Sequence, residues 1–318
     1  MIKANIKSLL TNLVPGIFLR FRHLRHIAGY KDLIHDLKAD QTSRKIDIKF
    51  GNHLFFIAGM PKSGSTWLQQ LLSSNRNLVK LNSSLLRSFP IKVKLGHPHN
   101  LNNLMFSCAP KNKFSLLKLH PHPSKSNLDI LKKNNVKTVI LIRDIRDVLV
   151  SDYFHSIVDK KDYKYSLLKG LSAEDALLKS VKTINAHNDI SDLEYYVNWL
   201  DGWVKESKKN PLNTLIIKYE EMHANLADVL KRIYNFYEYD INIDDINSLI
   251  VKHRLKHIQD LKGDFKKNLS KKGSYISTYR NGQINTWNQF FDTMHNPYIK
   301  KRISGILIKT GYEKDNSW

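Results

Sequence analysis

Four short apolar runs divide the chain into expected strands, with helical patterns between and after them. Residues 53–58, 114–120, 137–142 and 215–218 are mostly apolar and lack the polar alternation of a strand that faces water. Such runs predict buried strands, and the first of them reads as a strand of a parallel sheet. Apolar residues at helical spacing predict helices at residues 65–72, 127–135, from 143 onward, 172–208 (two helices), 225–239, on to about 260, 286–291 and 298–309.

The other stretches are expected to be less regular. Residues 1–50 predict one or two helices that pack as an N-terminal extension on a single domain of residues 51–318. The extension places apolar residues beside arginines, so peripheral contact with a membrane surface is the alternative to packing. Its polar interruptions argue against a signal peptide and against a membrane span. Residues 76–113 predict irregular structure.

A glycine loop joins the first predicted strand to the first predicted helix. Gly59 and Gly64 have the spacing of the phosphate-binding loop of nucleoside triphosphatases, but Ser65 stands where that loop needs lysine. The lysine lies inside the loop, at Lys62, which suits a single 5′-phosphate and its attached group. The loop resembles the 5′-phosphosulfate-binding loop of the sulfotransferases that use 3′-phosphoadenosine 5′-phosphosulfate (PAPS). The alternative is an ordinary strand-turn-helix corner with a chance lysine.

Composition and charge exclude few classes of protein. The chain has 318 residues, 42% of them hydrophobic and 10% aromatic, which is ordinary for a globular protein with a substantial core. Its formal charge of +22 attracts anions without naming one, because the basic residues are scattered along the chain. Cys108 is the only cysteine, so no internal disulfide and no cysteine metal site can form. The histidines lack an H-E-x-x-H pattern, so we expect no metal. The single cysteine fits a reducing compartment, and we expect a cytoplasmic protein.

A second candidate motif ends the strand at residues 114–120. Lys118-Leu119-His120 resembles the Lys-Thr-His segment of cytosolic sulfotransferases, in which the histidine is the general base. The pattern departs at Leu119 and at the prolines that follow, and His122 competes for the role of base. A structural histidine, hydrogen-bonded to a loop at the strand end, is the alternative.

A third candidate follows the strand at residues 137–142. Arg143 offers a fork that can hold a phosphate through two hydrogen bonds, and Ser151 lies two helical turns further on. Asp147 stands in the first turn of the helix between them. The segment resembles the 3′-phosphate-binding segment of the same sulfotransferases, with Ile145 at a departing position. The alternative is a structural Arg-Asp salt bridge.

The last two motifs lie in the C-terminal half. Tyr219-Glu220-Glu221-Met222 is similar to the family's Tyr-Glu-Asp-Met, which implies that Tyr219 lies against adenine and that the two glutamates are structural. Residues 279–287 resemble the family's Arg-Lys-Gly…Gly-Asp-Trp motif. Arg280 and Gly282 match, whereas Asn281 replaces lysine and residues 285–286 replace Gly-Asp. The aromatic residues of 195–203, in a stretch that resembles the family's tryptophan-rich helix, are assigned to packing.

Together these motifs identify the chain as a member of the PAPS-dependent sulfotransferases, closest in motif to the cytosolic type. The resemblance implies an α/β fold with a central, mostly parallel sheet flanked by helices and with ligands at the carboxyl ends of the strands. It implies catalytic roles for His120, Lys62 and Lys118. The implied cofactor-binding residues are Pro61, Lys62, Ser63, Gly64, Ser65, Thr66, Trp67, Arg143, Ser151, Tyr219, Arg280, Asn281 and Gly282.

The implied reaction moves the sulfuryl group of PAPS to a hydroxyl or amine and releases 3′,5′-adenosine bisphosphate (PAP), without a metal. The acceptor is a small molecule, a glycan or a lipid, and residues 76–113 and 155–195 are expected to shape its pocket. The sequence indicates no specific nucleic-acid partner and no oligomeric state. A P-loop kinase and a non-enzymatic binder of acidic glycan or nucleic acid are the alternative functions.

Overall fold

The computed structural model describes residues 53–81, 101, 106, 114–160, 162–184, 190–254 and 283–318. The predicted extension at residues 1–50, with its membrane contact, lies outside the described residues. So do Cys108 and the predicted cofactor residues Arg280, Asn281 and Gly282. The single domain of residues 51–318 stays a prediction. Within the described part of the chain no helix is long and apolar enough to cross a membrane.

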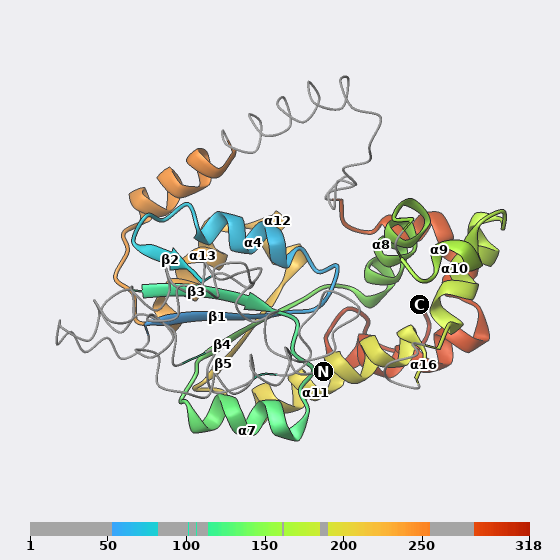
Figure 1. Cartoon of the computed structure of the whole chain (residues 1–318), viewed down its shortest axis with the longest axis horizontal. Coiled ribbons are helices and arrows are strands. Elements are labelled where there is room, and N and C mark those ends of the chain that lie inside the picture. The colour runs from blue at the N-terminus through green and yellow to red at the C-terminus, as the bar shows by residue number, and fades with distance from the viewer. Residues whose placement is uncertain are drawn as a thin grey trace, which may run out of the picture.

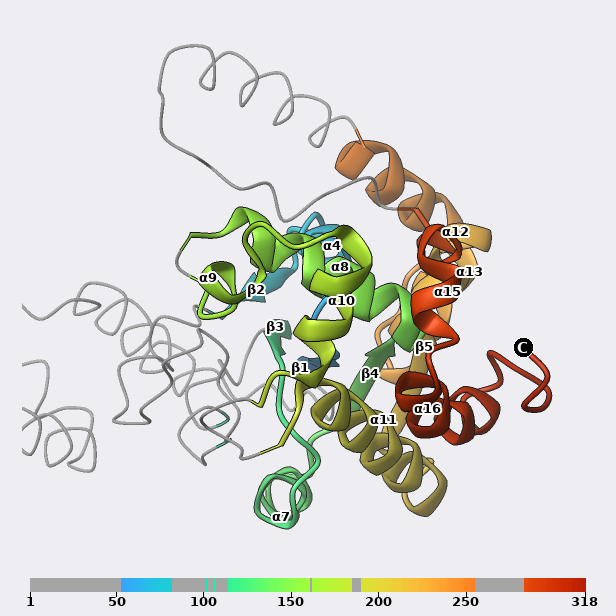
Figure 2. The ribbon, with the colours of Figure 1, turned by 90° about the vertical axis from the view of Figure 1, so that its right-hand side faces the viewer.

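The predicted parallel sheet is confirmed. Its strands are β1 (Leu54–Gly59), β2 (Leu78–Lys80), β3 (Phe114–Leu119), β4 (Thr138–Ile142) and β5 (Thr214–Lys218), in the order β2-β3-β1-β4-β5 with every pair parallel. Figure 2 shows this order across the sheet. The register pairs Ala58 with Leu119 and Ile142 with Lys218, so the strands end at a common edge. Strand β2 lies in the stretch expected to be irregular; with three residues it is too short to give a pattern.

Burial of both faces of the sheet explains why the strand sequences are continuously apolar. Side chains alternate between faces along a strand. In β1, Phe56 and Ala58 join one core cluster, whereas Phe55 and Ile57 join the other. The first cluster includes residues of the helices around Leu200 and Ile303, and the second those around Leu71 and Ile233. Each face therefore has its own hydrophobic core.

Helices cover both faces, as predicted. They are α4 (Ser65–Leu72), α7 (Lys125–Lys133), α8 (Ile145–Val158), α9 (Tyr165–Leu168), α10 (Ala173–Lys182), α11 (Asp192–Lys209), α12 (Tyr219–Ala224), α13 (Leu226–Phe236), the 3₁₀ helix η2 (Thr286–Phe290), α15 (Phe291–Met294) and α16 (Pro297–Lys309). Figure 1 shows α4, α12 and α13 on one side of the sheet, α7 and α11 on the other, and α8 to α10 beyond the strand ends. Helix α7 begins two residues before the prediction because the Ser124 side chain caps it by accepting from the Asn127 N–H.

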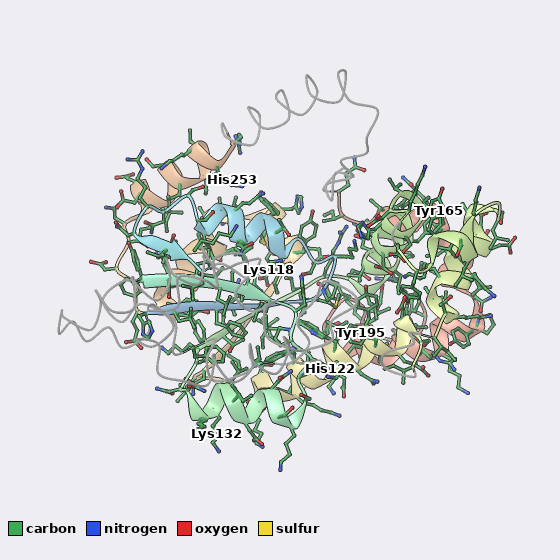
Figure 3. All side chains as sticks on the ribbon, in the orientation of Figure 1. Lys118, His122, Lys132, Tyr165, Tyr195 and His253 are labelled. Atoms are coloured by element: carbon green, nitrogen blue, oxygen red, sulfur yellow. The ribbon has the colours of Figure 1, made fainter. Side chains whose placement is uncertain are left out.

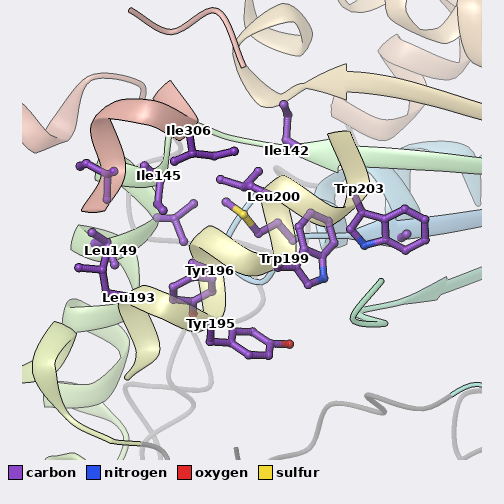
Figure 4. Packing of buried hydrophobic residues seen from close by; sticks show 14 of the residues in the cluster. Ile142, Ile145, Leu149, Leu193, Tyr195, Tyr196, Trp199, Leu200, Trp203 and Ile306 are labelled. Atoms are coloured by element: carbon purple, nitrogen blue, oxygen red, sulfur yellow. The ribbon is translucent and has the colours of Figure 1, made fainter. Parts of the chain in front are cut away.

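Helix α11 carries the aromatic stripe, and its assignment to packing is confirmed. Trp199 and Trp203 are fully buried, and Tyr195 and Tyr196 lie nearby in the same cluster (Figure 4). Both indole N–H groups also donate to the carbonyl oxygen of Pro121, at 2.8 Å from Trp199 and 3.2 Å from Trp203. The stripe therefore fixes the backbone directly after β3.

Candidate active site

The common edge of the sheet gathers the predicted site residues. The glycine loop follows β1, His120 follows β3, Arg143 follows β4 and Tyr219 follows β5. Parallel strands place their following loops side by side at their carboxyl ends, where α/β folds bind ligands. Segments that are up to about 160 residues apart in sequence thus meet at one edge.

The loop after β1 is a tight turn with two residues in the left-handed region. Ser63 donates from both its backbone N–H and its hydroxyl to the carbonyl oxygen of Met60, at 3.1 and 2.6 Å. Lys62 has φ of 65° and Gly64 has φ of 79°; an isolated left-handed lysine is uncommon and is often found at functional sites. Ser65 opens α4 and is buried, whereas Thr66 is exposed. The loop is held in one shape by its own hydrogen bonds.

Tyr219 packs directly against this loop. A Cβ atom on Gly64 would lie 2.5 Å from two ring carbons of Tyr219, so the close approach needs glycine. The Tyr219 ring also lies edge-on to Trp67, with centroids 5.9 Å apart, and 4.5 Å from the guanidinium carbon of Arg143. The structure thus brings together Trp67 and Tyr219, both predicted to bind the cofactor, and the arginine predicted to bind the 3′-phosphate.

Arg143 joins three segments. Its Nη1 donates to the carbonyl oxygen of Lys62 at 3.3 Å, and its Nη2 donates to Asp147 Oδ2 at 3.2 Å and to the carbonyl oxygen of Gln283 at 2.7 Å. The Arg-Asp salt bridge considered as an alternative is therefore present. Arg143 Nε is buried and has no hydrogen-bond partner among the described residues.

Asp147 fixes the segment at residues 283–287. Its Oδ1 accepts from the Thr286 hydroxyl at 2.8 Å and from the Trp287 N–H at 3.0 Å, and its Oδ2 accepts from the Asn285 N–H at 2.9 Å. Asn285 has φ of 58°. Asparagine tolerates this left-handed conformation better than most residues, which explains why it can replace the glycine of the family pattern here.

His120 is bound to the start of the glycine loop. Its Nδ1 lies 2.6 Å from the carbonyl oxygen of Gly59, and its Nε2 lies 3.4 Å from Lys118 Nζ. A carbonyl oxygen only accepts, and an ammonium group only donates. Nδ1 therefore carries the proton, and Nε2 of the neutral ring carries the lone pair. This is the tautomer that a general base needs.

His122, the competing candidate for the base, has different neighbours. Its ring lies 5.6 Å from the ring of Tyr195 on α11 (Figure 3). Burial lowers the pKa of His122. Its backbone carbonyl oxygen accepts from the Asn127 side chain at 2.7 Å. The hydrogen bond to the glycine loop is made by His120.

Beside Lys62 lies a buried charge network that the sequence did not reveal. Lys164 Nζ lies 2.5 Å from Asp152 Oδ2 and 2.8 Å from Asp192 Oδ2, and the Tyr163 hydroxyl donates to Asp192 at 3.0 Å. Burial lowers the pKa of Lys62, and the charge of Asp152 opposes this shift. The members of the network come from α8, the following loop and α11, so no local motif connects them.

The remaining predicted residues have plainer surroundings. Ser151 lies within α8 and is partly exposed. Glu220 accepts from the Asp144 N–H at 3.1 Å and from the Tyr312 hydroxyl at 2.7 Å, and Glu221 pairs with Arg232 at 3.0 Å. These contacts agree with structural roles for both glutamates. No group of three or more His, Cys, Asp or Glu side chains that could hold a metal occurs among the described residues.

Known proteins are similar to this chain over most of its length. The family model described as the sulfotransferase domain matches residues 53–311. A flavonol sulfotransferase-like protein of Flaveria bidentis is 24% identical over 280 residues, covering 80% of this chain and 82% of that protein. An amine sulfotransferase of Oryctolagus cuniculus is 24% identical over 212 residues, covering 61% of this chain and 59% of that protein.

A solved structure with a similar fold is retinol dehydratase in complex with androsterone and the inactive cofactor PAP. It is 18% identical, with a TM-score of 0.53, and the match covers 86% of this chain and 85% of that one. The family match spans the loop after β1 and all five strands of the sheet. The chain therefore belongs to the sulfotransferase family.

Proposed function

We propose that this protein transfers the sulfuryl group of PAPS to a hydroxyl or amine of a small-molecule acceptor and releases PAP. The hydrogen bond from His120 Nδ1 to the Gly59 carbonyl oxygen carries the proposal. It ties the residue proposed as the base to the first residue of the proposed phosphosulfate loop. The hydrogen bond thus fixes His120 next to the loop that carries Lys62. An in-line transfer requires such a fixed arrangement of the reacting groups.

In the proposed reaction the acceptor atom attacks sulfur while the bond from sulfur to the bridging oxygen breaks. His120 Nε2 takes the proton of the acceptor, and Lys62 stabilises the negative charge on the departing PAP. Lys118, 3.4 Å from Nε2, is close enough to add positive charge at the same place. The N-terminus of α4 favours the phosphosulfate through its unpaired backbone N–H groups.

A carboxylate base, considered as an alternative for a carbohydrate acceptor, is less well supported. Asp152 is the acidic group with the largest effect on Lys62. Burial alone would raise the pKa of Asp152, but the charges of Lys164 and Lys62 outweigh it and lower this pKa. A carboxylate that is stabilised in its charged form is a weak base. His120 is therefore the better candidate.

The relatives support a small-molecule acceptor without selecting one. Their names point to a flavonol and an amine, and the retinol dehydratase structure contains androsterone. Release of PAP from PAPS is a readout that all acceptors share. A phenol, a steroid alcohol, a primary amine and a sugar should therefore be compared by this assay, and we expect at least one of them to accelerate PAP release.

Two histidine variants then test the base with the best acceptor. His120→Gln should lower kcat by about 10²- to 10⁴-fold, the usual loss when a general base is removed. The matched change His122→Gln should leave kcat within about threefold, because His122 lies against Tyr195 and not against the loop. PAP binding should persist in both. If His122→Gln abolished turnover and His120→Gln did not, the assignment of the base would be wrong.

Cofactor selectivity is tested separately by thermal unfolding. PAP at about a hundred times its Kd should stabilise the protein by about 2.7 kcal/mol, and AMP or ATP at equal concentration should stabilise it less. The selectivity should be lost in Arg143→Ala. Equal stabilisation by all three nucleotides would argue against a 3′-phosphate site and would favour nonselective binding of anions.

A further inference from the structure

We propose that Asp147 is a positioning residue for recognition of the 3′-phosphate of PAPS. This inference rests on the proposed function, because it assumes that Arg143 binds the 3′-phosphate of PAPS. Asp147 itself would not touch the nucleotide. It would act by holding Arg143 and residues 283–287 in one fixed arrangement.

The argument begins with burial. The Asp147 side chain is 1% exposed, and such a carboxylate is costly to bury unless every lone pair is satisfied. Four donors surround it: Arg143 Nη2, the Asn285 and Trp287 backbone N–H groups, and the Thr286 hydroxyl. The carboxylate thus saturates its acceptor sites with groups from two parts of the chain that are about 140 residues apart.

The second step concerns the guanidinium of Arg143. An arginine recognises phosphate through a planar fork, so its plane must be fixed to give selectivity. Asp147 and the Gln283 carbonyl oxygen both accept from Nη2, and the Tyr219 ring lies 4.5 Å from the guanidinium carbon. These contacts fix the plane. The position of the Gln283 carbonyl group depends in turn on the hydrogen bonds that Asp147 accepts from residues 285–287.

Two physical effects of Asp147 oppose each other, and this makes the inference testable. As a negative charge beside Arg143, Asp147 weakens the attraction of the site for any phosphate. As a clamp, it strengthens recognition of the one phosphate that meets the fork of Arg143. Positioning predicts that removal of the charge lowers PAP affinity, whereas simple screening predicts that removal raises it.

The experiment measures Kd of PAP and of AMP by titration calorimetry in wild type and Asp147→Asn. The amide keeps one acceptor oxygen but presents an N–H group to existing donors, so the clamp is broken at nearly constant volume. The ratio of AMP Kd to PAP Kd should fall about tenfold, while AMP affinity changes by less than about threefold. A merely structural role would weaken both nucleotides equally and leave the ratio unchanged.

Matched variants keep the test decisive. Glu313→Gln makes the same chemical change beside Arg146, whose Nη1 lies 2.6 Å from Glu313, and should not alter the ratio. Thr286→Val removes one hydrogen-bond donor to Asp147 without changing the charge, so it should lower the ratio of AMP Kd to PAP Kd by about threefold. It replaces Asp147→Asn in the test if that variant does not fold.

If the ratio is unchanged or increased in folded Asp147→Asn, the inference about Asp147 is wrong, but the proposed function still stands. If Asp147→Asn does not fold, the same result in Thr286→Val has the same meaning. Wild type that does not prefer PAP to AMP would overturn the proposed 3′-phosphate site and the inference with it.

Discussion

Replacement of Gly64 by alanine tests how the loop after β1 is built. Gly64 has φ of 79°, and an added Cβ would lie 2.5 Å from Cδ2 and Cε2 of Tyr219. No real Cβ contact is that short, so either the loop or the ring must move. Tyr219 is also held by Trp67 and Arg143, so the ring cannot swing away without breaking other contacts.

The cost has two parts. An L-residue in the left-handed region costs about 1 to 2 kcal/mol relative to glycine. Overpacking against a fixed aromatic ring costs about 1 to 3 kcal/mol, and alanine regains up to about 1 kcal/mol by restricting the unfolded chain. We therefore expect Gly64→Ala to lower the free energy of unfolding by about 2 to 4 kcal/mol and to weaken PAP binding.

Urea denaturation followed by circular dichroism measures this change, provided that the slope with urea stays constant. The control is Gly305→Ala in α16, where an added Cβ meets nothing within 4 Å. That variant should gain about 0.5 to 1 kcal/mol, since alanine is the better helix former.

A double-mutant cycle with Tyr219→Ala separates the two parts. Without the ring, Gly64→Ala should cost only the backbone part, about 1 to 2 kcal/mol. The reasoning is refuted if Gly64→Ala is as stable as wild type, or if its cost is the same with and without the ring.

Three further predictions concern the charges and the backbone of the site. Because burial lowers the pKa of Lys62 in the ligand-free protein, kcat/KM for PAPS should decline on the alkaline side at a lower pH than for an ordinary lysine. In Lys62→Arg the pH profile should lose this decline. Lys164→Met should cost about 3 to 5 kcal/mol in urea, because it leaves two buried aspartates without their partner, whereas Lys205→Met at an exposed pair should cost less than about 1 kcal/mol. Because φ of Asn285 is 58°, Asn285→Gly should change the free energy of unfolding by less than about 0.5 kcal/mol, whereas Asn285→Val should lower it by more than about 1 kcal/mol. Equal stability of the two variants would contradict the need for a left-handed conformation at this position.

The sequence was sufficient to predict four of the five strands of the sheet and the loop that follows β1. Continuous apolar runs mark β1, β3, β4 and β5; the first three are buried on both faces or nearly so, and β5, at the edge of the sheet, is partly buried. The glycine loop and the Arg143 segment could also be predicted, because the residues of each motif lie within a few positions of one another in the sequence.

Contacts between distant segments could not be predicted in this way. The bridge made by Lys164 joins Asp152 and Asp192, which are 40 positions apart and belong to different helices. The hydrogen bond from His120 to Gly59 depends on the register of β1 with β3. Asp147 was visible in its helix turn, but its bonds to residues 285–287 arise only from the tertiary fold.

The anchoring of Pro121 by the two tryptophans of α11 has a consequence for how this enzyme can diversify. His120 is held by β1 on one side and is followed directly by a carbonyl oxygen that two buried indoles hold. The position of this proposed base therefore depends on core residues, whose packing is costly to alter. Helices α9 and α10, by contrast, carry no part of this anchor. Exposed side chains on these helices can therefore change without moving the ring of His120, the proposed base.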